Sequence, residues 1–389
     1  MSFLMFLSLQ EQGHLLPTFK LAKALERRGH RVVFLTDPQQ EGFVRAQGHE
    51  AVVVDHSFWP APAAPRGGAA GALDAINEVV SENREHLARL LRELRPGLCL
   101  VDGFVPSMAL AAYESGSPYV LLHTNLDTEM PGLVLGNIAG RAGIDPALAE
   151  AALRAPEMVL CPKAFDFPNA PHAGRTLYFV EASVDLSRRE PPFDWGPVDP
   201  EEPFVYCSLG SQAHCYPEAP RFFRAVLEAM AAQPRRRMVM SVGKVSPGGL
   251  GPVPPNVHLV GWAPQLEVLK KASVMITHGG LGTVKECIFF GVPMIAYPQA
   301  RDQPLTTARV VFHGLGRRGD ILHVTPAQVA ELIDDVERNP SYKERTEEMS
   351  RKFWEVEESG RGVKVVEKVL EVLGRRKGRG APDGGGRIG

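Results

Sequence analysis

Short apolar runs alternate with amphipathic segments through the first half of the chain. The apolar runs predict buried β-strands at residues 2–9, 31–36, 51–55, 98–102, 118–122, 157–161 and 176–180. A helix is predicted over residues 15–28, because apolar residues recur there on one helical face and Gly29 follows as a stop signal. A second helical pattern covers residues 73–94. This strand–helix alternation predicts a parallel sheet with helices on both faces.

A proline-rich, acidic segment at residues 183–203 interrupts the pattern and reads as a linker. The alternation then restarts, with apolar runs at residues 204–210, 238–242, 256–261, 273–277 and 292–297. Helical patterns lie at about 218–232, 282–290, 303–313 and 326–337, and two last helices at about 341–353 and 359–373 could fold back across the linker.

We therefore predict an α/β protein with two Rossmann-like domains, at residues 1–182 and 204–373, that face each other across a ligand-binding cleft. The Gly- and Arg-rich segment 374–389 has almost no apolar residue, so a disordered tail is expected there.

Composition narrows the classes of partner. The 389 residues carry a formal net charge of -2, which gives no reason to expect nucleic acid or an anionic membrane as the main partner. No apolar run reaches the roughly 20 residues that span a bilayer, and Gln10-Glu11-Gln12 stand where a signal peptide would have its cleavage site. The cysteines are scattered, so buried free thiols in a reducing cytoplasm are expected. A monomer or weak homodimer is expected.

The segment 258–304 carries the clearest chemical signal. A predicted strand ends at Thr277, and a glycine-rich turn and a helix follow it. Gly279, Gly280 and Gly282 leave the backbone bare at the helix start, where free N–H groups and the positive end of the helix dipole suit a diphosphate. Taken alone, the turn is equally compatible with a tight structural loop.

Side chains around this turn extend the anion site. Thr283 adds a hydroxyl, and His278 is a candidate cationic donor. Glu286 lies one turn into the helix, within reach of ribose hydroxyls.

The order of motifs resembles the donor-binding box of the GT-B nucleotide-sugar-dependent glycosyltransferases, a family that spans plant secondary-product enzymes and bacterial natural-product enzymes. The matching elements are Trp-Ala-Pro-Gln at 262–265, Thr-His-Gly-Gly at 277–280, Glu286, Gly-Val-Pro-Met at 291–294, Pro298, and Asp302-Gln303.

The resemblance implies a role for each of these residues. Trp262 would stack on the nucleobase, and Gln265 would contact the base or the ribose. His278 and Thr283 would hold the diphosphate. The remaining donor contacts that the resemblance implies are Ala263, the turn glycines Gly279, Gly280 and Gly282, Glu286 on the ribose hydroxyls, and Asp302 and Gln303 on the sugar hydroxyls.

Single residues of the box also have simpler interpretations. Trp262 could cap a core after its strand, and Glu286 could be an ordinary acid that the helix dipole favours. Asp302 beside Arg301 could form a solvated surface ion pair. The shared order of all the elements favours the ligand roles.

The box departs from the plant pattern in two places. It is two residues shorter between the tryptophan and the histidine, and Leu281-Gly282 stand where plant members carry Trp-Asn. Both features resemble bacterial members, which use thymidine as well as uridine diphosphate sugars. The resemblance therefore implies a UDP- or dTDP-sugar as co-substrate, and Asp302-Gln303 favour a hexose with free hydroxyls.

A second constellation lies near the N-terminus. His14 begins the first helix, where the dipole favours the neutral imidazole, and Asp102 ends the fourth strand at the carboxyl edge of the same sheet. A carboxylate there would orient the ring and stabilise the imidazolium. Alternatively, His14 is structural and Asp102 caps the next helix. The opening Gly13-His14-x-x-Pro17 resembles the same family, which implies that His14 is the general base and Asp102 its partner.

A smaller match is Ser-Leu-Gly-Ser at 208–211, a turn that is also common after strands. It resembles the family's Gly-Ser turn, which implies that Ser211 reaches the distal phosphate. No Asp-x-Asp pair of the type that binds a divalent metal to a diphosphate is present. No metal and no other cofactor is therefore expected, and the helix start with His278 would stabilise the leaving diphosphate.

These features predict an inverting, metal-independent hexosyltransferase with a small apolar acceptor, such as a natural product. The acceptor is expected in the N-terminal domain, against the loop at 56–72 and the segment at 123–140. The candidate contacts there are Phe58, Trp59, Met130 and Leu133. Two alternatives remain, a nucleotide-sugar 2-epimerase of the same fold and a catalytically silent nucleotide-sugar-binding activator of a partner enzyme.

Overall fold

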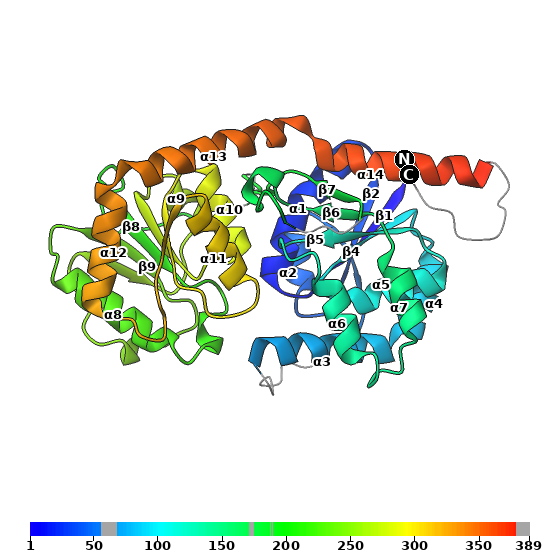
Figure 1. Cartoon of the computed structure of the whole chain (residues 1–389), viewed down its shortest axis with the longest axis horizontal. Helices are drawn as coiled ribbons and strands as arrows, with labels where there is room; N and C mark the ends of the chain where they lie inside the picture. The colour runs from blue at the N-terminus through cyan, green and yellow to red at the C-terminus, as the bar shows by residue number, and fades with distance from the viewer. Residues whose placement is uncertain (56–67, 171–174, 187, 189, 379–389) are drawn as a thin grey trace.

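The chain folds into two α/β domains that lie side by side (Figure 1). The computed structural model describes residues 1–55, 68–170, 175–186, 188 and 190–378. Each domain has one sheet, with seven and six strands in the described residues, and every strand pairing is parallel. The predicted fold class is therefore confirmed.

The first sheet has the strand order β3-β2-β1-β4-β5-β6-β7. Its strands are β1 Phe3–Leu7, β2 Arg31–Thr36, β3 Glu50–Val53, β4 Leu98–Asp102, β5 Tyr119–His123, β6 Glu157–Val159 and β7 Leu177–Phe179. The central strand β4 is buried at every position, as expected for a parallel sheet that is covered on both faces.

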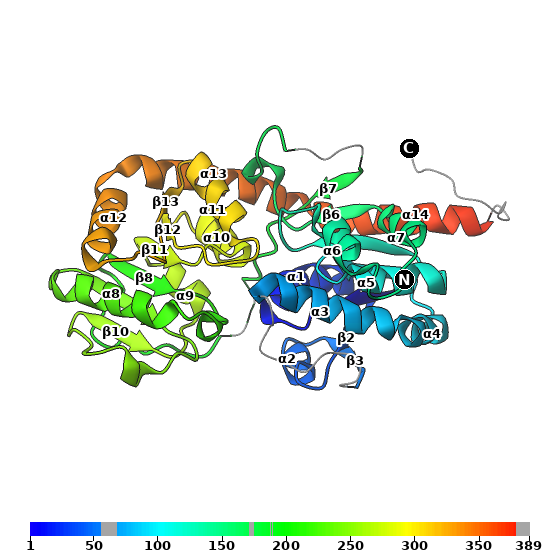
Figure 2. The ribbon, with the colours of Figure 1, turned by 60° about the horizontal axis from the view of Figure 1, so that its bottom comes forward.

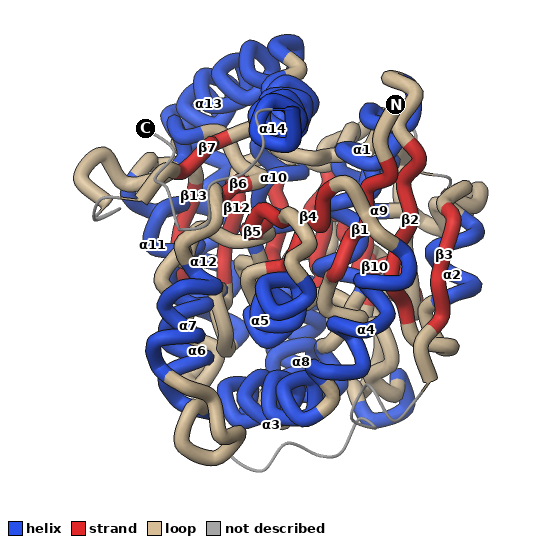
Figure 3. Tube along the Cα trace, turned by 90° about the vertical axis from the view of Figure 1, so that its right-hand side faces the viewer, coloured by secondary structure: helices blue, strands red, loops and turns tan. Residues whose placement is uncertain are grey.

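Helices cover both faces of this sheet (Figure 3). They are α1 Gln12–Arg27, α2 Glu41–Ala46, α3 Gly68–Glu82, α4 Arg84–Leu94, α5 Pro106–Ser115, α6 Met130–Ile138 and α7 Pro146–Leu153. Helix α1 packs on one face, and α3, α4 and α5 share a core on the other. Helix α1 begins three residues before the predicted start, which places His14 in its first turn.

The second sheet has the order β10-β9-β8-β11-β12-β13. Its strands are β8 Phe204–Ser208, β9 Arg237–Ser241, β10 Val257–Val260, β11 Val274–Thr277, β12 Met294–Ala296 and β13 Gly316–Arg318. Its helices are α8 Ala219–Ala231, α9 Gln265–Leu269, α10 Leu281–Phe289, α11 Gln303–Phe312, α12 Pro326–Arg338 and α13 Pro340–Ser359. Helices α8 and α12 pack on one face, while α9, α10 and α13 pack on the other.

The last helix, α14 Arg361–Gly378, returns to the first domain. In Figure 1, α13 runs along the second domain and α14 continues over the first. Val366 of α14 is fully buried in the core that α1 forms with the first sheet, and Val363 and Leu370 pack against the same core. Helix α14 thus folds back from the second domain, as the sequence pattern suggested, and completes the apolar face of the first domain.

Three details differ from the sequence-based prediction. The pattern at 73–94 forms two helices, because Asn83 interrupts them and donates its side-chain N–H to the Val79 carbonyl at 2.9 Å. The edge strand β13 was missed, since it carries exposed Arg317 and Arg318 in place of an apolar run. The predicted disorder from residue 374 is wrong for residues 374–378, which continue α14; residues 379–389 lie outside the described residues.

The two domains share buried contacts near the linker. The guanidinium of Arg309 on α11 donates two hydrogen bonds, of 3.1 and 2.9 Å, to the buried carboxylate of Asp166 in the first domain. The buried ammonium of Lys285 on α10 donates to the Leu160 carbonyl at 2.9 Å. Phe165 of the first domain and Phe353 of α13 lie in one apolar cluster. These contacts fix one domain against the other.

Two expectations from composition can be compared with the described residues. No helix in the described part of the chain is long and apolar enough to cross a membrane. All five cysteines are free thiols, but Cys215 is exposed, so the expected burial is wrong for that residue. It lies in a short turn after β8 and not in an apolar strand.

Val366→Ala should lower the free energy of unfolding by about 2 kcal/mol, because two buried methyl groups are lost at roughly 0.8 kcal/mol each and leave a cavity. A urea titration followed by circular dichroism measures the loss. Lys368→Ala on the exposed side of α14 is the matched control and should be nearly neutral. Equal stability of V366A and the unmodified protein would show that α14 does not support the first domain.

Candidate active site

The candidate residues gather where the strand order of each sheet changes direction. In the first sheet that point lies between β1 and β4, and in the second between β8 and β11. Ligands of open α/β sheets bind at the carboxyl ends of strands at such switch points. At these strand ends lie Asp102, the last residue of β4, and His14, in the first turn of the helix after β1; Ser211 and His278 follow β8 and β11. Glu11 after β1 contacts Arg301 after β12, so the two sheets turn these ends toward each other.

His14 and Asp102 form the predicted pair. The His14 Nδ1 lies 2.9 Å from Asp102 Oδ2. Asp102 is fully buried, and its carboxylate also accepts the backbone N–H groups of Leu9 at 3.2 Å and Phe104 at 3.0 Å. The next helix, α5, has Val105 as its N-cap, so the alternative of Asp102 as a helix cap is wrong.

The carboxylate determines which ring nitrogen of His14 can act as a base. An ionised carboxylate only accepts hydrogen bonds, so Nδ1 carries the proton that points to Asp102. Thr124 Oγ1 lies 3.1 Å from the same Nδ1, and the ring of Phe104 packs edge-on against the imidazole at 4.4 Å. None of the described residues hydrogen-bonds Nε2, which is left unprotonated as a proton acceptor.

The charged groups around His14 shift its pKa in opposite directions. Burial on its own would lower the pKa of His14, but the carboxylates of Asp102 and Glu11 raise it above its ordinary value, while the Arg301 cation opposes them. The net direction is upward. The two carboxylates thus outweigh burial and the cation, in the direction that the sequence-based argument for a nearby carboxylate implies.

The glycine-rich turn forms the bare helix start that the sequence predicts. Gly280 is the N-cap of α10 and supplies no side-chain cap. Gly279 has φ +79°, a backbone conformation that favours glycine, and a Cβ there would overlap Thr307 Oγ1. A Cβ on Gly280 would overlap the ring of His278. These glycines let the backbone approach a ligand at the helix start.

His278 is uncharged at neutral pH, which corrects its predicted role as a cation. Burial, with a smaller contribution from the Arg301 cation, lowers the pKa of His278 to about 4. The ring lies against the turn after β8, because a Cβ on Gly210 would come within 2.8 Å of its Cε1. Ser211, which is exposed, follows Gly210 directly, so the two predicted phosphate-contacting segments lie side by side.

A polar cluster joins three predicted donor residues. Gln265 donates a hydrogen bond from Nε2 to Glu286 Oε2, and the same nitrogen lies 3.3 Å from Thr283 Oγ1. Glu286 Oε1 accepts a 2.9 Å ion pair from Arg188 in the linker, and Arg188 also pairs with Glu190. Glu286 lies beyond the first turn of α10, so the helix dipole does not explain its presence. Its carboxylate is held in place by Gln265 and Arg188.

The remaining donor residues surround this cluster. Trp262 follows β10 with 55% of its surface exposed, so its ring is open for stacking. Ala263 is buried in the apolar core, so only its backbone can reach a nucleotide. Gly282 lies in the first turn of α10, with open space at its Cα.

Asp302 and Gln303 lie at the start of α11. Burial raises the pKa of Asp302, although His14 and the backbone of Leu281 act against it. Asp302 therefore lies close to both the base and the start of α10. Gln303 accepts the backbone N–H groups of Gln299 at 2.8 Å and Ala300 at 3.2 Å, so its side-chain oxygen shapes the loop. The neighbouring Arg301 pairs with Glu11, which excludes the simple Asp302–Arg301 surface pair.

Comparisons with known proteins agree with this geometry. Residues 184–370 match the sequence model of the family described as UDP-glucoronosyl and UDP-glucosyl transferase. This match covers most of the second domain, which is therefore similar to that glycosyltransferase family. It is 26% identical over 371 residues to NDP-glycosyltransferase YjiC of Bacillus subtilis (strain 168), which covers 90% of this chain and 91% of that protein. It is 29% identical over 324 residues to oleandomycin glycosyltransferase of Streptomyces antibioticus, with 76% and 74% covered.

Solved structures with the same architecture confirm the GT-B arrangement. The crystal structure of the glycosyltransferase of kitacinnamycin aligns with a TM-score of 0.76 and 27% identity over 95% of this chain and 99% of that chain. CalG4, the calicheamicin glycosyltransferase, aligns with a TM-score of 0.72 and 27% identity over 96% and 98%. The predicted enzyme class, sugar transfer from a nucleotide sugar, is thereby established.

Of the four candidate acceptor contacts, Met130 and Leu133 lie in the described part of the chain. Phe58 and Trp59 lie outside the described residues. Met130 begins α6 half-buried, and Leu133 on the next turn leaves 60% of its surface exposed. Leu133 is therefore an exposed apolar side chain on the helix that follows the loop carrying Thr124.

Sequence reasoning missed four residues of the glycosyltransferase site. Thr124 lies at the base, Glu11 and Arg301 link the two domains beside it, and Arg188 joins the donor cluster. Thr124 follows a predicted strand, which is a usable signal. The other three are charged residues in loops, and no pattern marks such residues until the chain is folded.

His14→Ala should lower turnover by about 100-fold or more, the usual scale of general-base catalysis. Asp102→Asn removes a charge that raises the pKa of His14, so the rising limb of the pH–rate profile should move to lower pH while turnover falls. Rate measurements between pH 5 and 9 (the range in which histidine titrates) test both variants. A limb that stays in place in D102N would contradict the assigned pair.

Glu286→Ala should weaken binding of the nucleoside diphosphate to the full chain by about 1–3 kcal/mol, the cost of leaving hydrogen-bonding groups unpaired. Calorimetric titration with UDP and dTDP measures the change. Glu267→Ala is the matched control, because Glu267 is an exposed carboxylate on α9 that pairs only with Lys270 among the described residues. Affinity within twofold of the unmodified protein would rule out Glu286 as a ribose ligand.

Proposed function

We propose that this glycosyltransferase moves a hexose from a UDP- or dTDP-sugar to a hydroxyl of a small apolar acceptor, with inversion and without a metal ion. The observation that carries the proposal is the His14–Asp102 pair, which lies beside Asp302 and close to the bare start of α10. A base and an anion site next to each other are what a direct displacement requires.

The reaction is a single displacement. His14 Nε2 accepts the acceptor's hydroxyl proton while the acceptor oxygen bonds to the anomeric carbon. The bond from that carbon to the diphosphate oxygen breaks, and the nucleoside diphosphate leaves with the electron pair. One displacement at one carbon inverts its configuration. Asp102 stabilises the imidazolium that forms, since its carboxylate lies 2.9 Å from Nδ1.

The leaving diphosphate is stabilised by the start of α10. The helix dipole and the N–H groups of Gly282 and Thr283 stabilise the departing charge, while the backbone of Leu281 interacts with Asp302. Because His278 is neutral, it acts as a hydrogen-bond donor and not as a fixed charge. These groups supply the stabilisation that a divalent cation provides in other enzymes.

The acceptor class is inferred from two observations. Leu133 and Met130 place apolar surface on α6 in the domain that carries the base. Two of the relatives are named as the glycosyltransferases of oleandomycin and of calicheamicin. A small, largely apolar natural product with a reactive hydroxyl fits both.

Incubation of the protein with UDP-glucose or dTDP-glucose and a library of apolar hydroxyl compounds tests the function. With an α-linked donor, the product should be the β-anomer by NMR, and saturating chelator should leave the rate essentially unchanged. His14→Ala is the control for enzyme-dependent transfer. Retention of the α-configuration, or activity that returns only with magnesium or manganese, would contradict the proposed mechanism.

A further inference from the structure

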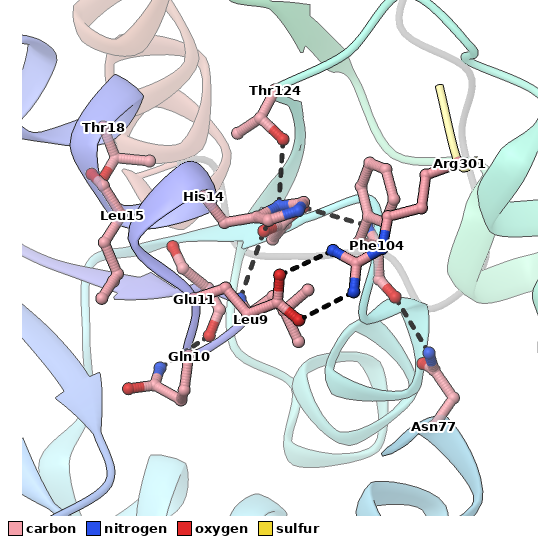
Figure 4. Close-up of polar contacts among 12 residues, drawn as sticks. Leu9, Gln10, Glu11, His14, Leu15, Thr18, Asn77, Phe104, Thr124 and Arg301 are labelled. Atoms are coloured by element: carbon pink, nitrogen blue, oxygen red, sulfur yellow. Dashed lines mark hydrogen bonds and ion pairs between the residues drawn. The ribbon is translucent and has the colours of Figure 1, made fainter. Parts of the chain in front are cut away.

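A bidentate ion pair crosses between the two domains next to the base. Arg301, in the loop before α11, donates from Nη1 to Glu11 Oε2 at 2.7 Å and from Nη2 to Glu11 Oε1 at 3.2 Å (Figure 4). Their side chains are only 30% and 24% exposed. Two parallel hydrogen bonds in a partly desolvated site are stronger and better oriented than an ordinary surface pair.

Both partners are attached to the catalytic machinery. Glu11 is the N-cap residue of α1, three positions before His14, and its carbonyl accepts the His14 N–H at 2.9 Å. Arg301 directly precedes Asp302 and Gln303, and Gln303 holds the loop in shape through the N–H groups of Gln299 and Ala300. The ion pair therefore joins the loop of the sugar residues to the helix start that carries the base. Figure 2 shows the same two domains turned by 60°.

The backbone of Arg301 indicates that its position is enforced. Its φ is +58°, in the left-handed region that a residue with a side chain enters only at a cost of about 1 kcal/mol or more. Such conformations persist where surrounding contacts hold them, and they cluster at functional sites. Among the described residues, Glu11 is the group that hydrogen-bonds this guanidinium.

We propose that the Glu11–Arg301 ion pair is an interdomain clamp, and that both are positioning residues that hold His14 in register with the sugar subsite at Asp302 and Gln303. The inference rests on the proposed function, because it assigns the clamp to that same transfer. It requires neither residue to touch substrate. Glu11 accepts from Nη1 and Nη2 of the guanidinium, so the clamp uses both of its terminal nitrogens.

In the described part of the chain, four charged groups act on His14. Asp102 comes from β4, Glu11 from the start of α1, and Arg301 and Asp302 from the loop before α11. Glu11 raises the pKa of His14, whereas Arg301 lowers it. Replacing either clamp residue should therefore shift the pKa of His14, whereas replacing a residue of purely structural importance should not.

A double-mutant cycle tests the clamp in the full chain. Glu11→Gln and Arg301→Gln should each lower turnover about 10-fold, and the double variant should lose no more than the worse single, since each single change already breaks the pair. Affinity for UDP or dTDP should stay within about twofold. Arg301→Lys keeps the charge and should restore part of the rate.

The matched control is Arg31→Gln. Arg31 pairs with Glu50 through two nitrogens as well, but both lie exposed within the first domain. This variant should keep full turnover. Additive losses in the cycle, or nucleoside diphosphate affinity that falls tenfold in R301Q alone, would overturn the clamp, the latter by showing that Arg301 binds phosphate directly.

A measurement without turnover separates this inference from the proposed function. In protein labelled with ¹³C-histidine, the resonance of His14 (assigned by its loss in His14→Ala) reports the ring's titration. Its pKa should rise in R301Q and fall in E11Q. Absence of these opposite shifts would overturn the clamp even if sugar transfer is observed. If the two pKa shifts are observed but no donor supports sugar transfer, the effect of the ion pair on His14 would stand and the proposed function would be refuted.

Discussion

The part of the site around His14 depends on one buried carboxylate, that of Asp102. Asp102 accepts hydrogen bonds from the loop after β1, from its own loop after β4 and from the imidazole of His14. A buried carboxylate is costly unless its oxygens are satisfied, so these partners must be in place together. The two loops at the switch point and the orientation of the base are therefore settled by the same group.

The two halves of the site use electrostatics differently. Around His14, fixed charges of both signs determine the protonation of one ring. At the start of α10 the backbone itself supplies the partial positive charge, and the nearby histidine is neutral. Under the proposed mechanism, this division would separate proton transfer at His14 from binding of the diphosphate at the helix start.

Much of this arrangement could be predicted from the sequence, and the failures have physical causes. The alternation of apolar runs predicted both parallel sheets, and the motifs near His14 and in the donor box indicated the family. The break at Asn83 and the strand at Gly316–Arg318 were missed, because local hydrogen bonding and edge position override apolar periodicity. The residues Glu11, Arg188 and Arg301 were missed as partners for a different reason. Pairings across 98 and 290 positions depend on how two domains meet, which no local pattern encodes.

Helix α14 has a consequence for how the protein is made. The face of the first sheet that α1 covers is completed by Val366, more than 300 positions after α1. Domains generally fold in order as they leave the ribosome. Here the first domain cannot close its apolar core until nearly the whole chain has been synthesised. The nascent N-terminal domain therefore carries an unfinished hydrophobic face throughout translation of the second domain, and chaperones that bind such surfaces have that long to act on it.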